Sequence, residues 1–265
     1  MRVFISADIE GTAFTTVWDE TKKDQGDYAA AAMQMTNEVK AACEGAIAAG
    51  ADYILVKDAH GTGRNIDIRQ LPKCCELIRS GTGSPRAMVE GIDESFDAAM
   101  FVGYHSAASR NGNPLSHTYS TKTTKITLNG ELCSEFILYS YCCAQYGVPT
   151  VFLSGDKMLT EDSQGLHPCL KTVAVKDGYG GFTRCKQPDY ACDLIREGAE
   201  AALKQDLTDA LCKLPDHFVF EITYKEHTSA ARYAYYPGFT LVDSYTIRME
   251  TDNYEDVLRC IPFVL

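Results

Sequence analysis

Residues 1–11 read MRVFISADIEG, and in this stretch a short apolar run, residues 3–7, stops abruptly at two acidic residues. That pattern is typical of a buried parallel strand that ends in a loop. An Ala-rich stretch follows over residues 28–49, where the larger apolar residues recur at near-helical spacing. A second apolar run, residues 53–56, completes a strand–helix–strand unit. The first 57 residues therefore predict an α/β fold with a parallel sheet.

The remainder of the chain extends this pattern and then changes it. Further strands are predicted at residues 76–78, 98–102, 125–128, 150–153 and 172–175, and helices at residues 135–145 and 189–204. Beyond Pro215, residues 217–223 and 241–249 alternate as half-exposed antiparallel strands do. We therefore expect a three-layer αβα main domain with a mostly parallel sheet, residues 1–205, and a smaller C-terminal α+β domain, residues 206–265.

Composition limits the classes of partner. The formal net charge is -11, and no basic tail stands out, so a nucleic-acid backbone is an unfavourable partner. No apolar stretch reaches the roughly 18 residues needed to span a membrane, and the N-terminus lacks the pattern of a signal peptide. None of the eleven cysteines forms a C-x-x-C pair, which favours reduced, buried thiols. These features predict a soluble cytoplasmic protein that binds neither nucleic acid nor membrane.

Metal-binding side chains follow three of the predicted strands. The first strand ends in Asp8-x-Glu10, the second in Asp58-x-His60, and the strand at residues 98–102 is followed closely by His105. Because binding sites in open parallel sheets form beyond the carboxyl ends of the strands, these residues are expected to lie close together. Carboxylates and imidazoles in one cluster are typical ligands of a pair of metal ions that activates a hydrolytic water.

Each of these residues taken alone is more often structural than functional. Asp and Glu directly after a strand are common as loop residues or helix caps, and a lone His is equally uninformative. The recurrence of such residues at successive strand ends is what favours a metal site.

Eight short motifs together resemble the D-aminopeptidase family of di-zinc metallopeptidases. They occur in the family's order and at compatible spacing over nearly the whole chain. The motifs are Asp8-Ile9-Glu10-Gly11, Asp58-Ala59-His60, Met88-Val89-Glu90-Gly91, Gly103-Tyr104-His105, Ser116-His117, Asn129-Gly130 with Glu135, Ser154-Gly155-Asp156 and Ala174-Val175-Lys176.

The resemblance implies a role for each site residue. The implied ligands of two zinc ions per subunit are Asp8, Glu10, His60, His105 and Glu135. His117 is implied as the catalytic residue, as nucleophile or as base. Glu135 follows Ser134, where a glycine is expected in the family, and Glu131 is a nearby alternative ligand. Asp58 could orient the ring of His60 from a second layer of residues around the metals, and a plain structural role is the alternative.

The resemblance also implies an activity and an assembly. The implied activity is removal of the N-terminal residue from short peptides or amides that begin with a D-amino acid such as D-alanine. The implied assembly is a homo-oligomeric ring of ten copies that encloses the sites. One rival is another di-metal hydrolase such as a phosphoesterase, which would need basic residues near the site, and the candidates are Lys57, Arg64 and Arg110. A second rival is a non-catalytic binding protein with the same fold, which the intact His117 disfavours.

A cluster of aromatic residues bears on the assembly. The cluster consists of Tyr233, Tyr235, Tyr236 and Phe239, around Pro237-Gly238. Aromatic residues are enriched at protein interfaces, so the cluster is consistent with a contact between subunits. The alternative is that these rings form the core of the smaller domain.

Overall fold

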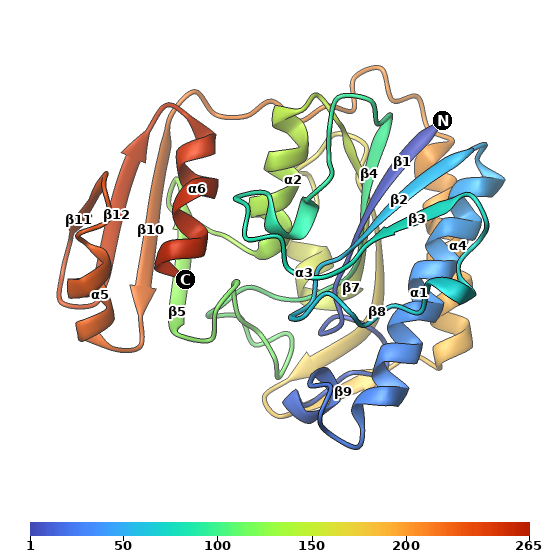
Figure 1. Cartoon of the computed structure of the whole chain (residues 1–265), viewed down its shortest axis with the longest axis horizontal. Coiled ribbons are helices and arrows are strands. Elements are labelled where there is room, and N and C mark those ends of the chain that lie inside the picture. The colour runs from blue at the N-terminus through green and yellow to red at the C-terminus, as the bar shows by residue number, and fades with distance from the viewer.

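The computed structural model describes residues 1–265, which form two sheets with helices packed on them (Figure 1). The larger sheet has seven strands. They are β1 (Arg2–Ala7), β2 (Tyr53–Asp58), β3 (Cys75–Ile78), β4 (Ala98–Tyr104), β7 (Thr150–Asp156), β8 (Lys171–Tyr179) and β9 (Phe182–Cys185). They are arranged in the order β3-β2-β1-β4-β7-β8-β9, and only the β8–β9 pair is antiparallel. The prediction of a mostly parallel α/β sheet is confirmed.

Helices cover both faces of this sheet, and the alternation of side chains along β1 explains why. Val3 and Ile5 lie in one hydrophobic core with residues of α1 (Tyr28–Ala48) and α4 (Pro188–Leu203). Phe4 points to the opposite face and lies in a second core with residues of α2 (Glu135–Gln145). Because a strand presents successive residues to opposite faces, a continuous apolar strand needs a layer on each side. The result is the predicted three-layer arrangement.

The smaller sheet has five antiparallel strands. Its strands and helices are β5 (Thr123–Leu128), β6 (Glu131–Leu132), β10 (Phe218–Tyr224), β11 (Phe239–Leu241), β12 (Thr246–Thr251), α5 (His227–Tyr233) and α6 (Tyr254–Val264). The strand order is β11-β12-β10-β5-β6. The single strand predicted at residues 241–249 is wrong. The chain turns there because the Asp243 carboxylate accepts hydrogen bonds from the N–H groups of Tyr245 and Thr246.

The strands of the smaller sheet are not contiguous in sequence. β5 pairs with β10, although β5 lies in the middle of the region predicted as the main domain. The chain thus leaves the larger sheet after β4, contributes a hairpin to the smaller sheet and returns through α2. We propose that the smaller unit consists of residues 206–265 together with the hairpin at residues 123–132.

The remaining elements are short. They are α3 (Lys157–Asp162) and the 3-10 turns η1 (Trp18–Thr21), η2 (Ile68–Gln70) and η3 (Ala87–Val89).

The order of the larger sheet reverses between β1 and β4. From β1 the chain adds β2 and β3 on one side, whereas β4, β7 and β8 follow on the other. Ligand sites in such sheets lie beyond the carboxyl ends of the strands at this reversal. The loop after β1 packs tightly against the end of β4 there, since a Cβ on Gly11 would lie 1.8 Å from the carbonyl oxygen of Tyr104. Gly103 also needs its φ of +72°, and a Cβ there would lie 2.3 Å from the Asp8 carbonyl oxygen.

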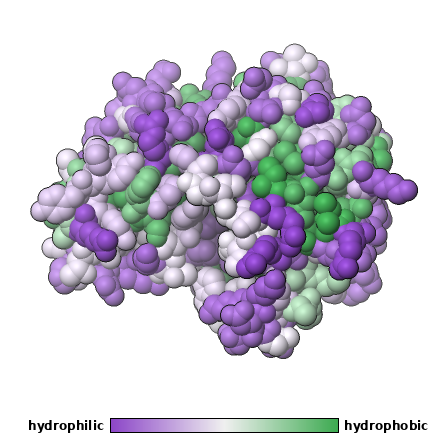
Figure 2. Space-filling view, in the orientation of Figure 1, coloured by the Kyte–Doolittle hydropathy of each residue, from purple (hydrophilic) through white to green (hydrophobic).

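Hydrophobic surface is limited in the orientation of Figure 1. Most of that face is hydrophilic, and hydrophobic residues gather over β2 and β3 (Figure 2). Of the aromatic cluster in the smaller unit, Phe239 is buried, Tyr236 packs against Phe263, and Tyr235 is 90% exposed. The cluster is therefore divided between the core and the surface. Among the helices there is none with the length and apolar character required to cross a membrane.

Candidate metal centre

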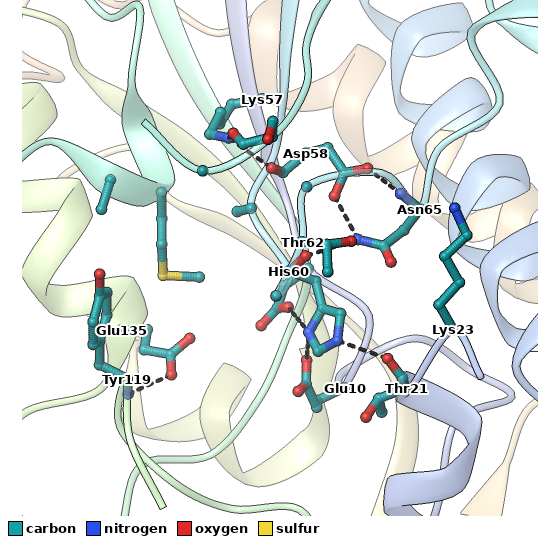
Figure 3. A pocket seen from close by; sticks show the side chains of 18 of the residues that line it. Glu10, Thr21, Lys23, Lys57, Asp58, His60, Thr62, Asn65, Tyr119 and Glu135 are labelled. Carbon is teal, nitrogen blue, oxygen red and sulfur yellow. Dashed lines mark hydrogen bonds and ion pairs between the residues drawn. The ribbon is translucent and has the colours of Figure 1, made fainter. Parts of the chain in front are cut away.

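Residues from the carboxyl ends of β1 and β2 form the first half of the cluster. Asp8 and Glu10 directly follow β1 and are buried. His60 follows β2, and its Nδ1 lies 3.3 Å from Asp8 Oδ1 and 2.8 Å from Glu10 Oε2. Figure 3 shows Glu10 and His60 directed at one another inside a pocket. The Asp8-x-Glu10 and Asp58-x-His60 motifs thus bring three of the expected ligands together.

Residues from β4 and α2 form the second half. His105 follows β4, and its Nε2 lies 3.4 Å from Asp8 Oδ2 and 3.4 Å from Glu135 Oε2. Asp8 therefore faces a histidine with each of its two carboxylate oxygens. The Nδ1 of His105 lies 3.0 Å from the carbonyl oxygen of Ser106. That contact leaves Nε2 as the ring nitrogen that faces the carboxylates.

His117 lies on the loop that follows His105 and closes the cluster from the side. Its ring stacks on that of His105 with 4.3 Å between the centroids, and its Nε2 lies 3.4 Å from Glu135 Oε1. The Nδ1 of His117 lies 2.8 Å from the carbonyl oxygen of Leu115, and the rings of Trp18 and His117 pack edge-on with 5.4 Å between their centroids. The ring is thus fixed with Nε2 toward the cluster.

The donor atoms are spaced as metal ligands are. Two overlapping groups have all their donor atoms within 4.8 Å of one another: Asp8 with Glu10 and His105, and His105 with His117 and Glu135. The Nε2 of His105 is buried and has no hydrogen-bond partner, which is unusual for a polar atom inside a protein. A mixture of carboxylate oxygens and imidazole nitrogens suits zinc and similar transition metals better than magnesium. The residues therefore fit the zinc ions that the resemblance implies.

The charges in the cluster depend strongly on one another. Burial, together with the negative charge of Glu10, raises the pKa of Asp8 to about 8. Burial opposes ionisation of Glu10 too, but the adjacent His60 holds its pKa well below the usual value. Burial alone would lower the pKa of His105 because it disfavours the charged ring. The carboxylates of Glu135 and Asp8 have the larger effect and raise this pKa to about 10. Three carboxylates buried together attract positive charge, which protons on the histidines or bound cations can supply.

Of the two roles considered for Asp58, the hydrogen bonds support the structural one. The Asp58 carboxylate accepts three hydrogen bonds, from the N–H and side-chain amide of Asn65 and from the N–H of Ile66. Those bonds shape the loop after β2 and do not reach the ring. The ring is held by the carbonyl oxygen of Thr21 in η1, 3.0 Å from His60 Nε2. Sequence reasoning missed Thr21 because a backbone carbonyl gives no signal in the residue type.

Glu135, and not Glu131, reaches the cluster. Glu131 is exposed on β6, whereas Glu135 is buried in the first turn of α2. The expected glycine before it is not needed, since Ser134 has an extended backbone with φ of -85°. Its hydroxyl also accepts a hydrogen bond from the N–H of Ile137 and so caps the helix. The N–H of Tyr119 donates to Glu135 Oε1 at 2.6 Å and holds the carboxylate in place.

Comparison with known proteins identifies the family. A protein-family model described as D-aminopeptidase, peptidase family M55, matches residues 1–263. The chain belongs to the D-aminopeptidase family. A D-aminopeptidase from Bacillus subtilis (strain 168) is 30% identical to it over 241 residues, which cover 90% of this chain and 86% of that protein. The predicted class of enzyme, a metallo-aminopeptidase, is confirmed. The two rival predictions, a phosphoesterase and a non-catalytic binding protein, are not supported by these matches.

A solved structure has the same fold. The structure of the Zn-dependent D-aminopeptidase DppA from Bacillus subtilis, described as a self-compartmentalizing protease, superposes with a TM-score of 0.93. The match covers 100% of this chain and 96% of that one at 24% sequence identity. Likeness at this identity establishes the arrangement of helices and strands.

In this D-aminopeptidase-family chain, residues beyond the predicted set hold the loops that carry the ligands. Lys176 on β8 donates to the carbonyl oxygens of Glu10 and Thr15, and the Asn113 side-chain amide donates to the Glu10 carbonyl at 2.9 Å. Asp156 at the end of β7 accepts from the N–H and hydroxyl of Ser106, beside His105, at 2.6 Å each. Asp156 and Lys176 fall within two of the motifs that carried the resemblance, but only the fold reveals what they contact.

The cluster lies in a pocket of about 700 Å³. Its walls come from three loops, which contribute residues 21–25, 57–63 with 65, and 80–84 with 87–88, and from residues around His117. Of the three basic residues that a phosphoesterase would need, only Lys57 lines the pocket, and Arg110 instead pairs with Asp162. The pocket has room for a short peptide, and Lys22 and Lys23 also line it.

Proposed function

We propose that this chain is a zinc-dependent aminopeptidase that hydrolyses the first residue from short peptides beginning with a D-amino acid such as D-alanine. The observation that carries the proposal is the buried Nε2 of His105, which makes no hydrogen bond and lies 3.4 Å from the carboxylates of both Asp8 and Glu135. Zinc dependence of the structurally similar Bacillus enzyme supports the choice of metal.

Five residues would hold two zinc ions, namely Asp8, Glu10, His60, His105 and Glu135. Asp8 is the shared ligand in this proposal, since its two oxygens face different histidines. Three carboxylates offset most of the charge of two divalent cations. When bound, the zinc ions would polarise the scissile carbonyl and lower the pKa of the attacking water.

His117 is proposed to transfer the proton or to attack the substrate directly. An Nδ1–H bonded to the Leu115 carbonyl leaves the lone pair of Nε2 free to act as an acceptor. Burial, together with the neighbouring His105, lowers the pKa of His117, which keeps the ring neutral. The ring of Trp18 packs edge-on against the same imidazole ring.

The stereochemistry of the substrate tests this function. Zinc-loaded protein is expected to hydrolyse D-alanyl dipeptides and D-alanine amide, and to hydrolyse the L-forms far more slowly. A chromogenic phosphate ester assayed in parallel is expected to give no turnover, because the chain belongs to a family of D-aminopeptidases. Amino acid release, measured by chromatography, is the readout.

We also propose that the chain assembles into a homo-oligomeric ring that encloses the sites. The self-compartmentalizing nature of the similar Bacillus structure supports this assembly. Tyr235 and Phe263, which are 90% and 64% exposed, are aromatic residues available for a contact between subunits.

Charge introduced at Tyr235 is expected to weaken the ring. The unmodified protein should have a mass many times 29.2 kDa by light scattering, and Tyr235→Glu should release smaller species. Tyr190→Glu on α4, where the tyrosine is 54% exposed, is the matched control and should leave the mass unchanged. A monomeric unmodified protein with full peptidase activity would contradict the proposed assembly.

A further inference from the structure

Lys57 is a buried cation without a carboxylate partner. It lies on β2 one residue before Asp58 and is only 3% exposed. Its Nζ donates to two neutral acceptors, the carbonyl oxygens of Asp58 at 2.8 Å and of Ser80 at 2.9 Å, and it takes part in no ion pair. An ammonium group can donate three hydrogen bonds, so one remains available. Buried lysines are rare unless their charge is paired.

The two carboxylates nearest Lys57 are committed elsewhere. The side chain of Asp58 is occupied by its three N–H donors from Asn65 and Ile66. Glu90 accepts hydrogen bonds from the hydroxyl groups of Ser84 and Thr82. The positive charge of Lys57 is therefore not neutralised by a contact within the protein.

The loop beside Lys57 offers free backbone donors. Residues 80–84 read Ser-Gly-Thr-Gly-Ser and line the same pocket as Lys57. The N–H groups of Gly81, Thr82 and Gly83 donate to no acceptor in the protein. The space beside both glycines is open, since a Cβ on either would meet nothing within 4 Å. Consecutive free N–H groups beside an ammonium are the chemistry of an anion-binding site.

The pocket connects this cation to the metal centre. Figure 3 shows Lys57 at the opposite end of the view from Glu10 and Thr21, with Asp58, Thr62 and His60 between them, and all of these residues line the pocket. When the first residue of a peptide lies at the metal ligands, the rest of the peptide extends away from them along the pocket. In a dipeptide or tripeptide, the end of that extension is a free carboxylate. The other lysines of the pocket, Lys22 and Lys23, are exposed to solvent, where a charge is screened.

We propose that Lys57, together with the free N–H groups of residues 81–83, binds the C-terminal carboxylate of a short peptide substrate. This subsite deepens the proposed peptidase function and rests on it. It makes the enzyme selective for peptides short enough to span the distance from the metal centre to Lys57.

A matched pair of substrates tests the subsite. The pair consists of a D-alanyl dipeptide with a free carboxylate and the same dipeptide amidated at its C-terminus. We expect the unmodified enzyme to have a KM about 10- to 100-fold lower for the acid than for the amide, the size expected of a charged hydrogen bond. Lys57→Met should remove most of that preference, Lys57→Arg should keep part of it, and Lys23→Met should change it less than about threefold.

A binding measurement separates recognition from damage to the loop. Calorimetry with the His117→Ala background should show tighter binding of the acid than of the amide, and the added Lys57→Met substitution should abolish the difference. Equal weakening of both ligands by Lys57→Met, with an unchanged ratio, would overturn the subsite and leave Lys57 as a support for residue 80. An unmodified enzyme that hydrolyses both dipeptides without preference would also overturn the subsite but not the peptidase. Failure to hydrolyse either one would refute the proposed function instead.

Discussion

The His117→Ala variant is expected to lose about 10²–10⁴-fold in kcat while it keeps its fold and its metal ions. The loss follows from the removal of the only imidazole of the cluster that is not assigned to a metal. The KM of a D-alanyl dipeptide should change much less than kcat, because His117 is proposed to act on the reacting atoms rather than on the ends of the substrate. Steady-state kinetics and elemental analysis of the same preparation provide both measurements.

Metal content decides between catalysis and ligation for His117. The Nε2 of this ring lies within 4.8 Å of donor atoms of His105 and Glu135, so the geometry alone permits either role. A variant that loses a zinc ion along with its activity would make His117 a ligand. His217→Ala, at an exposed histidine that pairs with Asp252, is the matched control and should keep full activity and metal content.

The Asp8→Ala variant is expected to lose both zinc ions and all measurable peptidase activity. Asp8 is the only carboxylate of the cluster that faces both His60 and His105, at 3.3 Å and 3.4 Å. Its removal leaves each proposed site short of a ligand. Elemental analysis after dialysis should find close to two zinc ions per chain in the unmodified protein and close to none in the variant.

The fold itself is expected to survive the loss of Asp8. Burial and the charge of Glu10 raise the pKa of this carboxyl to about 8, so its ionised form is unfavourable without a cation. The isosteric Asp8→Asn variant should therefore unfold, in the metal-free state, at a temperature no lower than that of the metal-free unmodified protein. A full zinc complement in Asp8→Ala would contradict the shared-ligand assignment. Asp52→Asn, at an exposed residue, is the control for the Asp8→Asn unfolding measurement, since it also removes one negative charge.

The main features of the fold could be predicted because they depend on local patterns. Residues 135–145 were predicted as a helix, and α2 has those same limits. The apolar runs at β1, β2 and β4 predicted parallel strands, and their acidic or histidine ends predicted which residues would meet. Because the carboxyl ends of parallel strands lie at one edge of a sheet, the sequence alone predicted that these residues would cluster.

The parts that failed depend on contacts between distant segments. The pairing of β5 with β10 joins residues about a hundred positions apart, and no local pattern encodes it. The carbonyl oxygen of Thr21 orients the His60 ring. The buried Asp58 carboxylate accepts hydrogen bonds from the loop after β2, because the donors nearest to it lie there. Lys57 was identified from sequence only as a cation for a rival function, and its burial in the peptide pocket became evident only in three dimensions.

The most direct test of the central claim is a zinc titration of metal-stripped protein, assayed with D-alanyl and L-alanyl dipeptides side by side. We expect no turnover without metal, a rise in hydrolysis of the D-dipeptide that levels off at about two zinc ions per chain, and far slower hydrolysis of the L-dipeptide throughout. Full activity in the stripped protein, or equal hydrolysis of the two stereoisomers at saturation with zinc, would contradict the assignment of this chain as a zinc-dependent D-aminopeptidase.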